Sequence, residues 1–170
     1  PVVRALQQDD RFESVVVSTG QHREMLEQVN KRFGITPDYD MELMKPGQNL
    51  NELVSRAIYG LDRIIDEEQP DVIISQGDTS TAMAAALAGF QKGVQIVHLE
   101  AGLRTGNIFS PFPEEANRKI IGQVTSLHLA PTNESRENLR RENFRSKDIV
   151  VTGNTVIDAL LTASKWQVEF

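Results

Sequence analysis

Carboxylates follow apolar segments at three places in this sequence, and carboxylates in such places can do acid and base chemistry. Asp78 follows the segment VIISQG, Glu100 follows VQIVHL, and Glu114 stands with Glu115 just after Pro113. A carboxylate at the end of a buried strand needs a partner or a function, because an unpaired charge is costly to bury. Carboxylates in different surroundings can divide the roles of general acid and general base. We therefore take Asp78, Glu100 and Glu114 as candidates for proton transfer.

Each candidate also has a purely structural interpretation. Asp78 and Thr79 are favoured residues at a helix start, so the segment QGDTST fits a helix cap without a ligand. Arg104 or Arg118 could neutralise Glu100 inside the protein. The two glutamates of the segment PEEANR fit the first turn of a helix, where acidic side chains stabilise the helix dipole. Residue types alone leave both interpretations open.

Metal and cofactor chemistry have little support in the residue pattern. The histidines His22, His98 and His128 show no metal spacing such as HExxH, and cysteine is absent. We interpret His98 as a residue of the sheet, whereas His22 opens a helix where it could meet a ligand. The segment QGDTST also lacks the GxxxxGK[ST] pattern of nucleoside triphosphatases. We expect neither a metal nor a cofactor.

The elements that must position these residues alternate along the chain. Apolar strand-like segments, several rich in β-branched residues, are followed by segments with helical spacing, which predicts an α/β fold with a Rossmann-like parallel sheet and helices on both faces. The carboxyl ends of parallel strands lie at one edge, where open α/β sheets bind ligands. Residues 37–48 read as a loop or an edge segment. The predicted strands are 14–19, 72–75, 94–100, 126–130 and 148–151, and the predicted helices begin near 21, 49, 79, 113 and 155.

Length and composition limit the class of protein. We expect one domain over residues 1–170, with a composition, 39% hydrophobic and 25% charged, typical of globular proteins. The longest run of small apolar residues, 82–90, is too short to cross a membrane. A net charge of -6 argues against a nucleic-acid surface. The absence of cysteine agrees with a cytoplasmic protein.

Long motifs in a fixed order resemble those of the non-hydrolysing UDP-N-acetylglucosamine 2-epimerases over nearly the whole chain. These motifs are GQHREML, PDVIISQGDT, HLEAGLRTG, PEEANR, APT and GNTVIDALL. The resemblance implies the first of two Rossmann-like domains that face each other in a GT-B arrangement. The chain opens on PVVRALQQ, which reads as the end of a helix, so we expect it to lack the first strand of that family and its GTRPE turn. It would also lack the second domain, which carries the uridine pocket and a catalytic histidine.

The resemblance further implies an activity and a set of residues. Members interconvert UDP-N-acetylglucosamine and UDP-N-acetylmannosamine, as cytoplasmic homodimers that serve cell-surface polysaccharides, through elimination and re-addition of UDP. It implies that Asp78, Glu100 and Glu114 are the acid and base candidates, and that Asp78 and Glu100 also bind substrate. With half of the enzyme missing, we expect this chain alone to be inactive.

Bacterial members also carry a regulatory UDP-N-acetylglucosamine site. Two residues depart from the pattern expected there, since Glu24 stands where some members have Gln and Gly47 where some have a basic residue. Retention of the full regulation is therefore not expected. The residues that match the expected regulatory positions are Gln21, His22, Gln48 and Glu115.

Other functions fit the same architecture. A glycosyltransferase that uses a nucleotide sugar would bind at the same sheet edge, but it would not need three carboxylates near one sugar carbon. A UDP-sugar binding domain without catalysis would use the edge for binding only. A metal-dependent phosphoesterase is a weaker alternative, and a chelator would reveal it.

Overall fold

The computed structural model describes residues 1–20 and 23–166. The chain divides into two compact units. Unit 1 comprises Pro1–Met44 and Asn154–Phe170, and unit 2 comprises Lys45–Gly153. The single domain expected over residues 1–170 stays a prediction.

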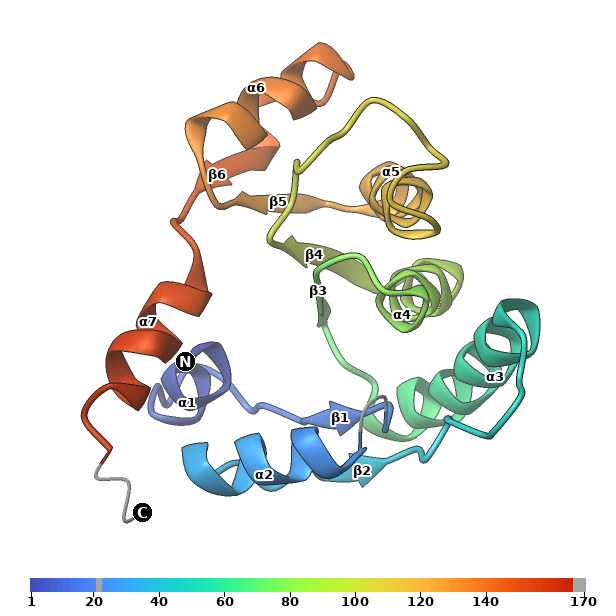
Figure 1. The fold of residues 1–170 in the computed structure, drawn as a ribbon, viewed down its shortest axis with the longest axis vertical. Helices are drawn as coiled ribbons and strands as arrows, with labels where there is room; N and C mark the ends of the chain where they lie inside the picture. The colour runs from blue at the N-terminus through green and yellow to red at the C-terminus, as the bar shows by residue number, and fades with distance from the viewer. Residues whose placement is uncertain (21–22, 167–170) are drawn as a thin grey trace. The chain divides into compact units, whose positions relative to one another are not determined.

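Unit 1 contains a small parallel sheet. Val17 pairs with Tyr39 and Ser18 with Asp40, so the segment predicted as a loop or an edge includes a short strand. The described elements of this unit are α1 (Val2–Gln7), β1 (Val17–Ser18), α2 (Arg23–Phe33), β2 (Tyr39–Asp40) and α7 (Thr155–Ala163). Asn154 caps α7, and its side chain accepts a hydrogen bond from the Val156 N–H at 3.1 Å. These elements can be followed in Figure 1.

Unit 2 is built on a parallel sheet of four strands in the order β3-β4-β5-β6. Its strands are β3 (Val72–Gln76), β4 (Gln95–Leu99), β5 (Leu127–Ala130) and β6 (Ile149–Val151). Its helices are α3 (Leu50–Glu68), α4 (Ser80–Gln91), α5 (Glu114–Val124) and α6 (Asn133–Arg141), with a short 3-10 helix at Ser146–Asp148. The sequence predicted one sheet. The described strands form two sheets, β1-β2 and β3-β4-β5-β6.

Side chains with oxygen acceptors start the helices of unit 2. Asn49 accepts from the Glu52 N–H before α3, Thr79 accepts from the Ala82 N–H before α4, and Thr132 caps α6 in the same way. These bonds satisfy backbone donors that the first turn of a helix leaves unpaired. The sequence predicted a helix that begins near residue 113. In the structure α5 begins at Glu114, and Pro113 directly precedes it.

Helices cover one face of the four-stranded sheet. Ile73 and Ile96 are register partners, and they pack with Ala86 of α4 and Ile121 of α5. Figure 1 shows α4 and α5 on the same side of the strands. At the other end of that face Leu139 of α6 packs against residues of β5 and β6. The parallel strands and their flanking helices confirm the predicted α/β, Rossmann-like class. Helices on both faces are not seen in unit 2, because strands in the order β3-β4-β5-β6 with crossovers of one hand put α4, α5 and α6 on the same face.

No helix in the described ranges is long and apolar enough to cross a membrane.

Candidate active site

Asp78 lies in the turn between β3 and α4, which is fastened to the neighbouring strand. The Gly77 N–H donates to the Leu99 carbonyl oxygen at 3.0 Å, and His98 Nε2 lies 2.7 Å from the Gly77 carbonyl oxygen, to which it donates. Gly77 has a φ of +76°, a conformation that glycine adopts without a steric penalty. The turn that carries Asp78 is therefore held against the end of β4.

Helix α5 holds Asp78 itself. Arg118 donates to Asp78 Oδ2 from Nε at 2.9 Å and from Nη2 at 2.7 Å, while Asn117 Nδ2 donates to the Asp78 carbonyl oxygen at 2.8 Å. Burial lowers the pKa of Arg118, but its bonds to Asp78 and Glu115 raise it by more, so the guanidinium stays charged. The capping residue of α4 is Thr79, which leaves the Asp78 side chain to this ion pair.

Glu100 follows β4 directly and has an unusual backbone. Its φ is +69°, in the left-handed region that residues other than glycine rarely adopt. The side chain is half-buried and makes no hydrogen bond or ion pair with any residue that the structure describes. The alternative in which an arginine neutralises Glu100 is not seen, because Arg104 pairs with Glu142 at 2.7 Å and Arg118 pairs with Asp78.

Glu114 and Glu115 share the first turn of α5 but have different surroundings. Glu114 is half-buried and, within residues 1–20 and 23–166, has no hydrogen-bonding or ionic partner. The Glu115 side chain is 0% exposed, and its two oxygens accept from the N–H groups of Thr105 and Gly106 and from Arg118, each at 3.1 Å. Burial raises the pKa of Glu115, but these bonds together lower it below its ordinary value. Glu115 is thus an anchored anion, whereas the Glu114 side chain has no described partner.

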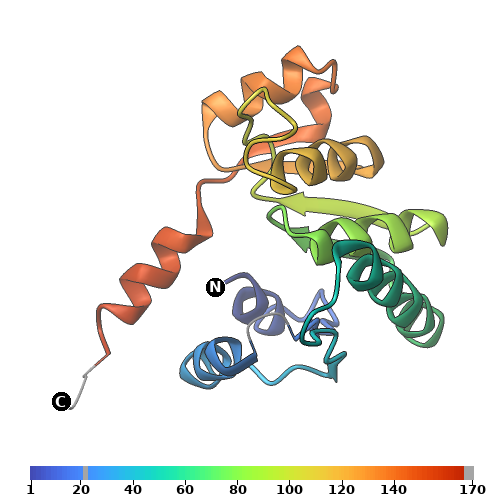
Figure 2. The ribbon, with the colours of Figure 1, turned by 45° about the vertical axis from the view of Figure 1, so that its right-hand side comes forward.

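The three predicted carboxylates come together at one edge of unit 2. Gln76 of β3 pairs with Leu99 of β4, so the turns that carry Asp78 and Glu100 leave neighbouring strand ends. Helix α5, which begins with Glu114, is bonded to the Asp78 turn. The loop from Glu100 to α5, drawn in yellow, starts at the tip of β4 in Figure 2. The edge therefore offers one carboxylate held by an arginine and two without partners.

Only two of the four predicted regulatory residues, Gln48 and Glu115, lie within the described residues. Gln21 and His22 lie outside the described residues. Gln48 lies ahead of α3, where its side-chain oxygen accepts from Arg56 Nη1 at 3.1 Å. Glu115 belongs to the buried cluster with Arg118. The regulatory assignment stays a prediction.

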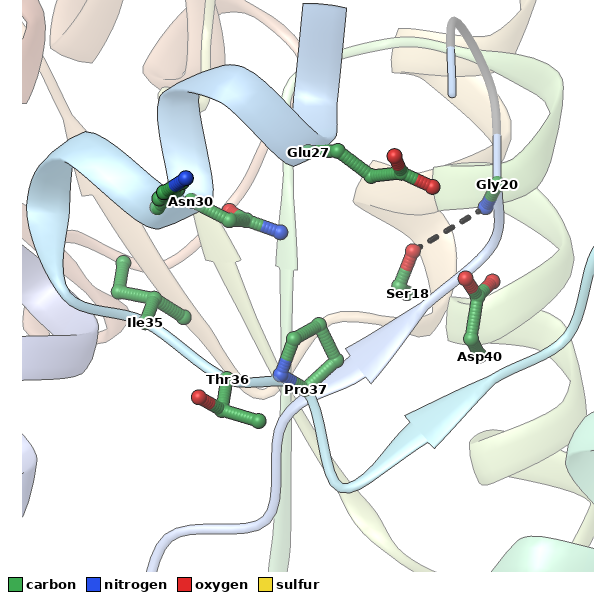
Figure 3. Close-up of a pocket in the computed structure, with 9 residues that line it drawn as sticks. Ser18, Gly20, Glu27, Asn30, Ile35, Thr36, Pro37 and Asp40 are labelled. Atoms are coloured by element: carbon green, nitrogen blue, oxygen red, sulfur yellow. Dashed lines mark hydrogen bonds between the residues drawn. The ribbon is translucent and has the colours of Figure 1, made fainter. Parts of the chain in front are cut away.

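A hollow of about 320 Å³ opens in unit 1 near the end of β1. In Figure 3, Ser18, Glu27 and Asp40 gather around Gly20 at the end of β1. Ser18 Oγ accepts from the Gly20 N–H at 3.3 Å, and Asp40 Oδ1 accepts from the Glu42 N–H at 3.2 Å. The hollow is lined by both acidic and apolar side chains, and no ligand follows from its residues alone.

Three residues of the site were not identified from the sequence. Asn117 and Arg118 hold Asp78, and His98 holds the preceding glycine, although the sequence indicated only a sheet position for His98 and an ion-pairing role for Arg118. Their positions could have indicated these roles, since Asn117 and Arg118 lie within PEEANR and His98 lies two residues before Glu100.

Among residues 1–20 and 23–166, no group of three or more histidine, aspartate and glutamate side chains could hold a metal ion.

Comparison with known proteins assigns the chain to a family. The family model described as UDP-N-acetylglucosamine 2-epimerase matches residues 4–169. The UDP-N-acetylglucosamine 2-epimerase of Yersinia pestis is 54% identical over 160 residues, which cover 94% of this chain and 43% of the relative. That of Escherichia coli K12 is 52% identical, with 95% of this chain and 43% of the relative covered. This chain thus spans less than half the length of these relatives.

A solved structure agrees with this assignment. The UDP-GlcNAc 2-epimerase of Neisseria meningitidis, bound to UDP-GlcNAc, superposes with a TM-score of 0.94 and 45% sequence identity. The match covers 97% of this chain and 44% of the other. The sequence motifs, the carboxylates at the sheet edge and these matches lead to the same conclusion: the chain belongs to the UDP-N-acetylglucosamine 2-epimerase family.

Proposed function

We propose that this chain is the proton-transferring half of an isomerase that interconverts UDP-N-acetylglucosamine and UDP-N-acetylmannosamine. The observation that carries the proposal is Glu100, a half-buried carboxylate without a described partner, held in a left-handed backbone at a strand end. Backbone strain of this kind clusters at functional sites. Membership of the family supplies the substrate class.

The reaction needs a base and an acid at one carbon. The base removes the proton from C2 of the sugar while the bond from C1 to the UDP oxygen breaks, and the electron pair of the C2–H bond forms the C1=C2 double bond of a glycal. The UDP oxygen then adds back to C1 as the acid delivers a proton to C2 from the opposite face. No metal or cofactor enters these steps. Proton transfer by positioned side chains accelerates such steps by roughly 10²–10⁴-fold.

Asp78, Glu100 and Glu114 are the proposed groups for these transfers, and Asp78 and Glu100 also contact the substrate. Arg118 fixes the orientation of Asp78. The side-chain oxygens of Glu100 and Glu114 have no described hydrogen-bonding or ionic partner. An edge with one fixed and two unpaired carboxylates supports a division of acid and base roles.

The rest of the enzyme is also part of the proposal. Since the chain covers 43% of its relatives, a second Rossmann-like domain in a GT-B arrangement would complete the site and bind uridine. We expect a cytoplasmic homodimer that serves cell-surface polysaccharide synthesis. The family resemblance places a regulatory site at Gln21, His22, Gln48 and Glu115, and full regulation is not expected. The 170-residue chain alone should form no epimerised product, and turnover by it would contradict this expectation.

The test uses a hybrid in which this chain replaces the matching segment of the Escherichia coli relative. The hybrid is incubated with UDP-N-acetylglucosamine in deuterium oxide, and the C2 proton is followed by NMR. We expect loss of the C2 proton signal and formation of the epimer. Asp78→Asn and Glu100→Gln should slow both by roughly 10²-fold or more. Glu134→Gln, an exposed change on α6, is the control and should leave both rates unchanged.

A hybrid that binds UDP-N-acetylglucosamine without exchanging the C2 proton would exclude the epimerase function. A glycosyltransferase or a UDP-sugar binding domain would then account for the site.

A further inference from the structure

A buried carboxylate with no proposed step in the reaction stands behind the active-site edge. The Glu115 side chain is 0% exposed, yet it lies in the same helical turn as Glu114. Burying a charge without partners is costly, so its contacts must compensate for the lost hydration. Those contacts lead to two other parts of the site.

The first contact leads to Asp78. Arg118 donates from Nη1 to Glu115 Oε2 at 3.1 Å, and from Nη2 and Nε to Asp78 Oδ2. A guanidinium is planar, and its donors have a fixed geometry, so a bond on one side restricts where the other side points. Glu115 therefore limits the orientation in which Arg118 meets Asp78.

The second contact leads to the loop that connects Glu100 with α5. The backbone N–H groups of Thr105 and Gly106 donate to Glu115 Oε2 and Oε1, each at 3.1 Å. One carboxylate thus ties this loop to the first turn of α5. The side chain has no exposed surface through which to meet a ligand.

We infer that Glu115 is a positioning residue, which holds Asp78 through Arg118 and holds the loop after Glu100 through Thr105 and Gly106, without touching substrate. The inference rests on the proposed epimerase function. It assigns to Glu115 a role different from the regulatory contact that the sequence resemblance implied.

The first test is Glu115→Gln in the hybrid enzyme. Glutamine keeps the size of the side chain but replaces one acceptor oxygen with an NH2 group, so at least one of the three donors, Thr105 N–H, Gly106 N–H and Arg118, loses its acceptor. Misplacement of a catalytic group can lower the rate on the order of 100-fold, so we expect kcat to fall by about that factor while KM changes by less than about threefold. Glu137→Gln, an exposed change on α6, is the matched control and should leave kcat within about twofold of the unsubstituted value.

A double-mutant cycle shows whether Glu115 acts through Arg118. Arg118→Lys keeps the charge, but a single ammonium cannot bridge both carboxylates in the same way. Because Glu115 also anchors the loop, we expect the double variant Glu115→Gln, Arg118→Lys to lose activity beyond Arg118→Lys alone, but clearly less than the product of the two single losses. Losses that multiply would overturn the inference, as would an unchanged kcat in Glu115→Gln. The activities of all variants are measured at a temperature below the lowest thermal unfolding midpoint among them.

A second measurement separates this inference from the proposed function. Amide hydrogen exchange of Thr105 and Gly106 is recorded by NMR in the 170-residue chain. We expect Glu115→Gln to raise the exchange rate of at least one of these two amides by about tenfold or more, whereas Glu137→Gln leaves both unchanged. An inactive unsubstituted hybrid would refute the epimerase function alone, and unchanged exchange rates would refute the anchoring role.

Discussion

Two arginine clusters in unit 2 use the same chemistry in different surroundings. Arg118 lies between Asp78 and the fully buried Glu115, while Arg104 binds Glu142, whose side chain is 23% exposed. Lys119 also binds Glu142 at 2.8 Å, so that carboxylate has a second cation. In the part of the chain that the structure describes, Arg118 is the only cation paired with Glu115. The first cluster lies at the proposed catalytic edge and has one described cation for the buried Glu115, whereas the carboxylate of the second cluster has two cations.

The largest effect on stability is expected from Arg118→Gln. The change leaves Glu115 buried with backbone donors alone, and breaking a buried ion pair typically costs about 3–5 kcal/mol. We expect the free energy of unfolding of the 170-residue chain to fall by about 3 kcal/mol in urea denaturation. Arg136→Gln, which removes an exposed contact at 3.7 Å, is the control and should change it by less than about 0.5 kcal/mol. Equal losses in the two variants would contradict the distinction between buried and exposed clusters.

Arg104→Gln should destabilise the chain less. Glu142 would keep Lys119 and some contact with water, although Arg104 is itself only 8% exposed and also donates to the Leu103 carbonyl oxygen. We expect a loss of about 2 kcal/mol in the same denaturation experiment. A loss larger than that of Arg118→Gln would show that Lys119 is no substitute for Arg104.

The pH dependence of stability should reveal the Glu142 cluster. The hydrogen bond from Arg104, against the effect of burial and with help from Lys119, lowers the pKa of Glu142 from 4.5 to about 2. The unfolded chain then binds a proton more readily than the folded chain below pH 4.5, so stability present above that pH is lost as the pH falls toward 2. Glu142→Gln should reduce this loss by about 1 kcal/mol, since partial exposure screens the pair.

The measurement is the urea midpoint at a series of pH values between 2 and 6. Glu137→Gln changes an exposed carboxylate and serves as the control, which should leave the slope as it is in the unsubstituted chain. An identical slope in Glu142→Gln would contradict a lowered pKa for this residue.

The smallest effect is expected from Lys119→Gln. Its side chain is 40% exposed, and exposed ion pairs contribute less than about 1 kcal/mol. We expect a change below about 0.5 kcal/mol in the unsubstituted chain but a clearly larger one in the Arg104→Gln background, where Lys119 is the remaining described cation at Glu142. Equal effects of Lys119→Gln in both backgrounds would show that Lys119 does not compensate for the loss of Arg104 at Glu142.

The difference between the two clusters also marks how far the sequence could predict the site. Asp78 and Glu100 were found because they follow apolar strands, and strand ends in a parallel sheet meet at one edge. The capping of α4 by Thr79 depends on neighbouring residues and was likewise within reach. Such local patterns also gave the α/β class and most of the strands.

Pairing between distant residues was beyond prediction from one sequence. Arg118 and Asp78 are separated by 40 positions, and Arg104 and Glu142 by 38. Which arginine meets which carboxylate depends on how α5 and the loop before it pack on the sheet. The burial of Glu115, next to a half-buried Glu114, follows from the same packing and not from residue type.

The left-handed backbone of Glu100 has a consequence for how this position would change under selection. Glycine would relieve the unfavourable φ, so a library of variants sorted only for heat resistance should accumulate Gly at position 100. A library sorted for product formation should retain the carboxylate. The residue recovered at this single position would therefore record which of the two properties was selected.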